Sequence, residues 1–232
     1  MKGRQPTTET DEDLAQVIRG HGPCTFLLLA LIALILLYPY FQEGVLARVS
    51  LAVLFLLVLI GGAFAIRQSR PVLIVKIGLA LAGLALEWTA LWRGNTTMLV
   101  LAGIPYAAFL AVTIGEVLDY ILRRGPVTAD KLHGALAGYI MLALLWAFIY
   151  ALIERLSPGS FGPNRIDLGQ PGAFFQLIYF SLTTLTTTGF GDITPMTNQA
   201  RSFVMVEEFA GLFFVGVVIA RLAGLYPPTF NQ

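Results

Sequence analysis

The sequence predicts an all-α membrane protein with six transmembrane helices and one shorter, re-entrant helix. Two observations carry this prediction. Of the 232 residues, 56% are hydrophobic and only 12% are charged, whereas an ordinary soluble domain carries about 25% charged residues. The hydrophobic residues also gather in stretches of roughly 20, the length that a helix needs to cross a bilayer. This composition argues against a soluble enzyme, and no nucleophile, base and orienting residue form a catalytic pattern.

Six stretches are apolar and long enough to form the spans. They follow a polar segment, 1–22, and are Cys24–Phe41, Val45–Ile66, Val72–Trp92, Met98–Leu122, Gly134–Leu156 and Arg201–Tyr226. A further apolar stretch, Ala173–Leu185, is too short to cross and predicts the re-entrant helix. Residues 227–232 would form a short cytoplasmic tail.

The basic residues predict the orientation, because short loops rich in Lys and Arg stay in the cytoplasm. With the N-terminus inside, ten of the 15 basic residues fall on the inner side and five on the outer side. Both termini of this multi-pass protein would then be cytoplasmic, and the loop 157–172 would face outward. Short loops and the single cysteine, Cys24, suit a bacterial plasma membrane, and a net charge of +1 gives no basic field for nucleic acid.

The segment Thr183–Pro195, TTLTTTGFGDITP, does not suit a membrane helix. Its β-branched residues and glycines disfavour a helix interior, and irregular backbone at membrane depth is tolerated only where it is buried in protein or lines a watery path. Gly189 and Gly191 permit positive φ at alternate positions, which turns the carbonyls toward one side. Four such segments around an axis would stack rings of carbonyl oxygens that replace the hydration shell of a cation. The pattern indicates an ion filter.

The hexapeptide Thr187 to Asp192, TTGFGD, resembles the filter signature of the potassium channel superfamily, and Thr184-Leu185-Thr186 before it extends the match. Residues 134–226, with an outer helix, a half-helix, the filter and an inner helix in that order, resemble the pore domain of that superfamily. The resemblance implies a homotetramer in which each chain contributes one filter segment. It also implies passive, potassium-selective conduction, with K+ as the permeant ion and no organic cofactor. Membrane lipids would surround the channel.

The resemblance assigns the ion sites to the filter. K+ would bind to the hydroxyl of Thr187 and to the carbonyls of Thr187, Thr188, Gly189, Phe190 and Gly191. Relatives most often have Val and Tyr where this chain has Thr188 and Phe190. Thr188 therefore adds a hydroxyl that needs a partner, and Phe190 packs without a hydroxyl to donate. These departures keep a weakly selective cation channel open as an alternative.

Three residues beside the filter would hold its shape, again by resemblance. Asp192 would stabilise the filter mouth through hydrogen bonds. Tyr179 and Phe180 match the positions at which aromatic residues of the half-helix surround the filter in this superfamily. The C-terminal end of the half-helix would point its partial negative charge at the central cavity, where it favours a cation.

Two acidic residues lie inside the last span, where a charge is expensive. Glu207 and Glu208 are adjacent, so their side chains point about 100° apart and cannot share one partner. One of them would support the filter by bonding to Thr183 or Thr188. The alternative is that a Glu lies close enough to the outer surface to snorkel.

The last span also carries the candidate gate. Gly211 matches the spacing of the glycine hinge in many potassium channels, and Gly216 is a second candidate, although close helix packing explains a membrane glycine equally well. One face of this helix would line the cavity through Leu212, Val215 and Ile219.

Residues 23–124 would form a four-helix domain that resembles a voltage sensor without its gating arginines. The fourth span, Met98–Leu122, contains no Lys or Arg, so steep voltage dependence is not expected. Lys76 and Glu87 in the third span are roughly 16 Å apart along the helix axis, too far to pair. Each lies near an end and is expected to snorkel.

Two other classes of membrane protein fit less well. A secondary transporter usually contains paired repeats with interrupted helices in both halves, but residues 1–133 contain no second copy of the filter segment. An accessory subunit without its own pore leaves the filter segment unexplained.

Overall fold

The computed structural model describes residues 22–40, 56, 58–61, 70–123, 128–170 and 172–224. In chain order the elements are α2 (Pro23–Leu37), the 3-10 helix η1 (Tyr38–Tyr40), α4 (Arg70–Arg93), α5 (Thr96–Leu122), α6 (Ala129–Leu156), β1 (Phe161–Gly162), α7 (Ala173–Leu185), β2 (Thr194–Pro195) and α8 (Asn198–Gly224). The two short strands pair antiparallel, with Phe161 opposite Pro195. The predicted segments 1–22 and 227–232 and most of the span Val45–Ile66 lie outside the described residues.

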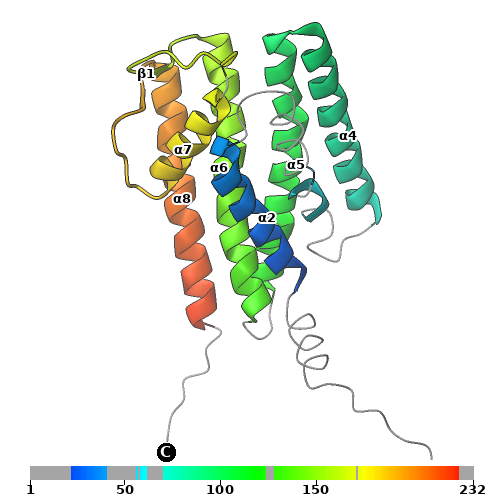
Figure 1. Cartoon of the computed structure of the whole chain (residues 1–232). Coiled ribbons are helices and arrows are strands. Elements are labelled where there is room, and N and C mark those ends of the chain that lie inside the picture. The colour runs from blue at the N-terminus through cyan, green and yellow to red at the C-terminus, as the bar shows by residue number, and fades with distance from the viewer. Residues whose placement is uncertain are drawn as a thin grey trace, which may run out of the picture.

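Helix α6 is the centre of the helical arrangement (Figure 1). The α4–α5 pair packs on one side of it through α5, and α7 and α8 pack on the other side. Helix α2 crosses α6 in the lower half, whereas α7 occupies only the upper half and lies beside α8. The short α7 is thus enclosed by longer helices.

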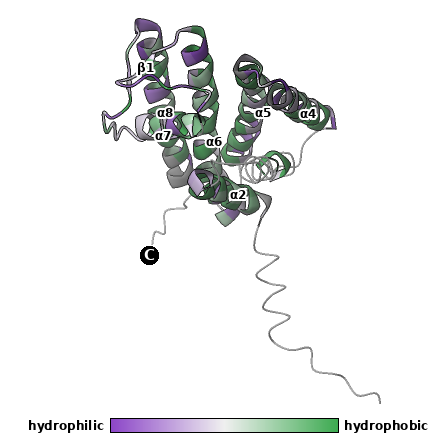
Figure 2. Ribbon diagram, turned by 45° about the horizontal axis from the view of Figure 1, so that its top comes forward, coloured by the Kyte–Doolittle hydropathy of each residue, from purple (hydrophilic) through white to green (hydrophobic). Residues whose placement is uncertain are grey.

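Three helices in the described part of the chain are long and apolar enough to cross a membrane, namely α4, α5 and α6. Figure 2 shows hydrophobic residues along the helices and hydrophilic residues concentrated near their ends and around β1. The short apolar helix α7 has the bounds that the sequence predicts, Ala173–Leu185. The predicted spans agree with α4, α5, α6 and α8 except at their first residues and, for α4 and α8, also their last.

Polar caps explain where the central helices begin. The Asn95 side chain accepts hydrogen bonds from the backbone N–H groups of Thr97 and Met98, and the Thr128 hydroxyl accepts one from Lys131. Such caps satisfy N–H groups that the first turn of a helix leaves without partners. At the other end of α6, the buried Glu154 carboxylate accepts from the N–H groups of Gly159 and Phe161 and so fixes the start of the loop.

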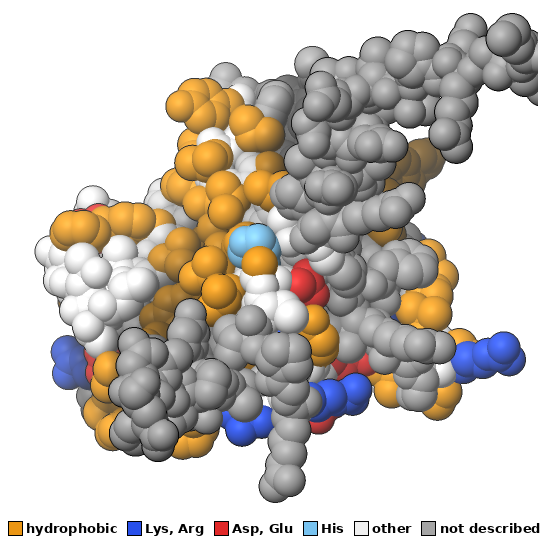
Figure 3. All heavy atoms as spheres, turned by 90° about the horizontal axis from the view of Figure 1, so that it is seen from below, with side chains coloured by type: hydrophobic (Ala, Val, Ile, Leu, Met, Phe, Trp, Pro, Cys, Tyr) orange, Lys and Arg blue, Asp and Glu red, His pale blue; other side chains and the backbone are white. Residues whose placement is uncertain are grey.

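The lower ends of α2, α5 and α6 meet at Asp130. Its carboxylate accepts from the backbone N–H of Cys24 at 3.0 Å and from the Tyr120 hydroxyl at 2.9 Å. The Thr25 hydroxyl lies 2.7 Å from Nδ1 of His133. Figure 3 shows this end from below, where a histidine and charged side chains lie among hydrophobic ones. These bonds fix the three helices to one another at the end predicted to be cytoplasmic.

The prediction that Lys76 snorkels is wrong. Its side chain is fully buried, and Nζ lies 2.8 Å from Oε2 of Glu116 on α5 and 5.4 Å from the centre of the Phe109 ring. Glu87 also has a partner inside the bundle, because its carboxylate accepts a hydrogen bond from the Tyr106 hydroxyl at 2.7 Å. Charges inside a membrane find partners when a neighbouring helix offers them, and α5 offers both.

Candidate functional site

The filter segment is attached to the last turn of α7 by backbone hydrogen bonds, in which N–H groups of the segment donate to carbonyls of α7. The N–H of Thr187 donates to the Thr184 carbonyl at 2.9 Å. The Thr183 carbonyl accepts twice, from Thr188 at 2.9 Å and from Gly189 at 3.2 Å. These bonds use the N–H groups of the first three residues of the segment. Among the described residues, no hydrogen bond is accepted by the carbonyls of residues 187–190, which leaves those oxygens available to a ligand.

The backbone of the segment alternates in handedness. Thr187, Gly189 and Gly191 have φ values of +57°, +51° and +81°, whereas Thr188 and Phe190 between them keep negative φ. Alternating backbone of this kind gathers its N–H groups on one side, so the carbonyls face the other. A β-branched residue such as Thr187 rarely adopts positive φ, and a conformation of this kind costs of order 1–3 kcal/mol and is typical of functional sites.

The side chains of the segment are exposed to the surroundings in a single chain. Residues 186–192 are all exposed, and the Phe190 side chain is 70% exposed. The hydroxyl of Thr188 finds its partner in Thr186, 2.9 Å away, and not in a glutamate. A surface of this kind in an otherwise apolar protein is suited to a neighbouring chain or to ions and water.

The structure separates the two predicted aromatic supports. Tyr179 stacks on Phe190 with ring centres 6.2 Å apart and planes only 3° from parallel, and it also lies beside Asp192. Phe180 packs instead against Tyr150 and Phe161, at 5.4 Å from each. Within one chain, therefore, Tyr179 contacts the filter segment and Phe180 anchors α7 to the core.

Glu207 lies behind α7, fully buried. Its carboxylate accepts hydrogen bonds from the hydroxyls of Ser181 on α7 and Tyr150 on α6. The bond predicted to Thr183 or Thr188 is therefore wrong, since the Thr183 hydroxyl donates to the Phe180 carbonyl at 2.9 Å. Glu207 ties together three helices within two turns of the filter, while Glu208 is exposed.

Close packing explains Gly211. A Cβ atom on this residue would lie 2.7 Å from the Leu185 carbonyl oxygen and 2.9 Å from the Leu185 side chain. The same carbonyl accepts a hydrogen bond from the Tyr139 hydroxyl of α6 at 2.6 Å. The end of α7 is thus held between α6 and α8. At Gly216, by contrast, no atom of the described residues beyond the adjoining α8 backbone lies within 4 Å of a Cβ position.

The exposed face of α8 bears a shallow, open apolar hollow that this one helix lines. Its walls contain the predicted residues Leu212 and Gly216 together with Phe209, Phe213, Val217 and Ala220. Val215 is 40% exposed but lies outside this hollow. Ile219 belongs to the α8 backbone, and its side chain lies outside the described residues.

Sequence reasoning missed Tyr139, Tyr150 and Ser181. A signal for the two tyrosines exists, because they are eleven residues apart on α6 and therefore lie on one face of that helix. Hydroxyls repeated on one face of an apolar helix indicate partners on a neighbouring helix.

Comparison with known proteins places this site in a family. The family described as "Ion channel" matches residues 138–226, which include α7, the filter segment and all of α8. The potassium channel protein kcv of Paramecium bursaria Chlorella virus 1 is 31% identical over 32% of this chain and 81% of its own length. The chain belongs to the potassium channel family. No solved structure matches significantly.

Longer members of the potassium channel family are similar over the same region. The calcium-gated potassium channel TvoK of Thermoplasma volcanium is 22% identical over 42% of this chain and 25% of its own length. The hyperpolarization-activated voltage-gated potassium channel of Methanocaldococcus jannaschii is 26% identical over 50% of this chain and 51% of its own. This chain thus spans only a quarter to a half of these two relatives.

Proposed function

We propose that the protein is one subunit of a homotetrameric potassium channel of the plasma membrane. K+ would pass down its gradient through stacked rings of oxygens, each ring with one oxygen from each of the four subunits. The oxygens would come from Thr187, Thr188, Gly189, Phe190 and Gly191. The observation that carries this proposal is the backbone of the filter segment. The N–H groups of its first three residues are bound to α7 and its φ values alternate in sign, so we infer that free carbonyls line one side, as dehydrated K+ requires.

The exposed surfaces support the tetramer. In one chain the filter segment and the apolar hollow of α8 lack cover. A four-fold axis beside both of them would bring four filter segments together and place Leu212 and Val215 near the cavity. Asp192 and Tyr179 would then stabilise the mouth of the filter, and Glu207 would hold α8 against α7.

The proposed topology has six spans with both termini in the cytoplasm. They are α2 with η1, the span 45–66, α4, α5, α6 and α8, with α7 re-entrant. Residues 134–226 form the pore domain, and residues 23–124 form a four-helix domain that does not sense voltage strongly.

The test is the reversal potential of the purified protein reconstituted in a planar bilayer, with K+ on one side and Na+ on the other. The proposal predicts a value near the potassium equilibrium potential and block by Ba2+. Gly191→Ala is the matched negative variant, since a side chain at a φ of +81° is strained. A parent protein that passes neither ion in bilayers or liposomes contradicts the proposal.

A weakly selective cation channel is the second candidate. Phe190 favours it, because its ring has no hydroxyl with which to tie the filter to its surroundings. A reversal potential near zero with clear current identifies this candidate. Phe190→Tyr would then move the value toward the potassium equilibrium potential.

A further inference from the structure

Glu87 lies on α4 six residues before Arg93, and a tyrosine of α5 approaches it. The Tyr106 hydroxyl donates to Oε2 of Glu87 at 2.7 Å. The Glu87 carboxylate is therefore joined to an aromatic side chain on α5, and that side chain leads toward α7.

The route to α7 runs through α5 and α6. The Tyr106 ring lies 5.9 Å from the ring of Phe148 on α6, and Phe148 lies 4.7 Å from the ring of Phe174 on α7. Glycines make room for both rings. A Cβ on Gly83 would lie 2.4 Å from the Tyr106 ring, and one on Gly103 would lie 2.8 Å from the Phe148 ring. The rings therefore sit in notches of the neighbouring helices.

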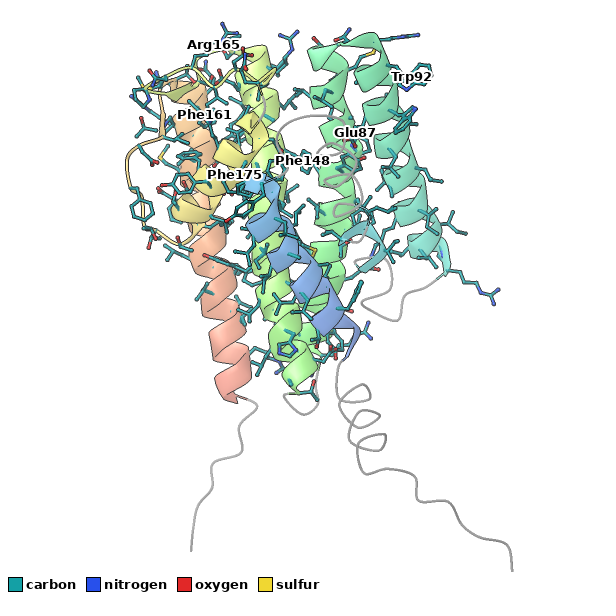
Figure 4. All side chains as sticks on the ribbon, viewed as in Figure 1. Glu87, Trp92, Phe148, Phe161, Arg165 and Phe175 are labelled. Carbon is teal, nitrogen blue, oxygen red and sulfur yellow. The ribbon has the colours of Figure 1, made fainter. Side chains whose placement is uncertain are left out.

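The same turn of α7 has a second aromatic partner. Tyr38 stacks on Phe175 with ring centres 5.5 Å apart and planes 20° from parallel. Phe174 and Phe175 are consecutive residues in the first turn of α7. The row of rings from Glu87 thus ends on a helical turn that is packed on more than one side. In Figure 4 the labelled residues Glu87, Phe148 and Phe175 form a row from the α4–α5 pair to α7.

We propose that Glu87 is a positioning residue for the filter, acting through Tyr106 and Phe148 on the first turn of α7. This inference rests on the proposed channel function. The filter hangs from the far end of the same 13-residue helix. Closely packed interiors transmit strain, so a ring that shifts at the first turn of α7 tilts the helix and displaces the carbonyls at its last turn.

The test compares the Na+ to K+ permeability ratio of reconstituted variants. Tyr106→Phe removes only the hydroxyl that binds Glu87, and Phe148→Leu interrupts the row of rings. Each is expected to raise the ratio about threefold. This is the change in an equilibrium constant that corresponds to the free energy of a typical hydrogen bond between membrane helices. Glu87→Gln keeps an acceptor oxygen and should remain near the parent. Because the two changes lie on one route, the double variant should exceed the larger single effect by little.

Tyr120→Phe is the matched control. Tyr120 also lies on α5 and also donates to an acidic residue, Asp130, at 2.9 Å, but the lower end of α5 lies far from α7 (Figure 1). This variant should leave the permeability ratio unchanged. Equal changes in Tyr106→Phe and Tyr120→Phe would overturn the proposal, because they would reveal a general loss of packing.

A second measurement separates the failure of this inference from the failure of the channel function. Amide hydrogen exchange of the first turn of α7 is measured on the detergent-solubilised full chain and needs no ion current. Tyr106→Phe and Phe148→Leu should accelerate exchange there about threefold, while Tyr120→Phe should not. If the parent shows no K+ preference, the proposed function fails, and the exchange data still decide whether Glu87 positions the first turn of α7. Unchanged exchange in both variants overturns the role of Glu87.

Discussion

The two sides of α6 are held together by different chemistry. On the α7–α8 side the polar contacts are buried hydroxyls that converge on Glu207 and on the Leu185 carbonyl. On the α4–α5 side they are side-chain pairs between α4 and α5, of Lys76 with Glu116 and of Glu87 with Tyr106. Burial differs as well, since 50% of the most apolar window of α6 is buried but only 11% of that of α4.

This difference shows what each side requires. The filter segment needs its supporting helix fixed at several points, and Ser181, Leu185 and Gly211 provide such points within two turns of the filter. Helix α4 mostly faces the surroundings, with large apolar side chains exposed. Its packing on α5 includes two polar side-chain pairs inside the bundle, and breaking one of them should be costly.

The largest effect is expected on the α4–α5 side, from Lys76→Met. The change leaves the Glu116 carboxylate, whose side chain is only 19% exposed, without its cation. Removing one partner of a buried pair costs about 3 kcal/mol or more. Denaturant unfolding in detergent micelles measures this loss.

The control for Lys76→Met is the exposed pair at the C-terminal end of α5, Arg123 with Asp119, whose side chains are 63% and 62% exposed. Arg123→Ala should cost less than about 0.5 kcal/mol, because exposed pairs contribute little. Similar losses in both variants would show that the burial of Lys76 contributes nothing to stability.

The next effect is expected on the pore side, from Glu207→Leu. The substitution leaves the hydroxyls of Ser181 and Tyr150 without the carboxylate that they bind. Buried donors without acceptors cost about 2 kcal/mol, and α7 loses its bond to α8, so the Na+ to K+ permeability ratio should rise. Reversal potentials and unfolding curves measure the two effects.

Glu207→Gln keeps an acceptor and should lie between Glu207→Leu and the parent. Glu208→Gln changes the exposed neighbour and should leave the selectivity as it is. If both Gln variants conduct and select like the parent, Glu207 does not act on the filter through its charge. If Glu207→Leu also conducts and selects like the parent, Glu207 does not support the filter at all.

A smaller effect is expected from Gly211→Ala. The new methyl group would lie 2.7 Å from the Leu185 carbonyl oxygen, and overpacking costs about 1–3 kcal/mol, partly offset by the helix preference of Ala. Gly216→Ala is the matched control, because no described atom beyond the adjoining α8 backbone lies within 4 Å of its Cβ position. Thermal unfolding should show a lower midpoint for the first variant and an equal or higher one for the second. The reverse order would mean that α8 bends at Gly216 and not at Gly211.

Much of the fold follows from the sequence, because span length and hydropathy depend on neighbouring residues only. The bounds of α7 and the last residues of α5 and α6 agree with their predictions. The positive φ of the glycines in the filter segment is also predictable from the local sequence, because positions that require positive φ favour glycine.

The polar contacts could not be predicted, because they join residues that are distant in sequence. Glu207 is 26 residues from Ser181 and 57 from Tyr150, and Lys76 is 40 residues from Glu116. Spacing along one helix determines which face a residue occupies, but not which helix packs against that face. The positive φ of Thr187 is likewise invisible in the sequence, since a β-branched residue would be expected to avoid it.

The smallest effect is expected when voltage is varied. Voltage sensors move several charges per subunit through the membrane field, but the described α5 contains no Lys or Arg, and its half-buried Glu116 is paired with the buried Lys76 on α4. A pair that moves together carries no net charge. The current of the reconstituted protein should therefore be near-ohmic between about −100 and +100 mV, in contrast with the archaeal relative described as voltage-gated. Steep rectification in the parent would contradict this expectation. Voltage dependence that appears only in Lys76→Met would show that the ion pair, and not the lack of arginines alone, keeps the α4–α5 side insensitive to the field.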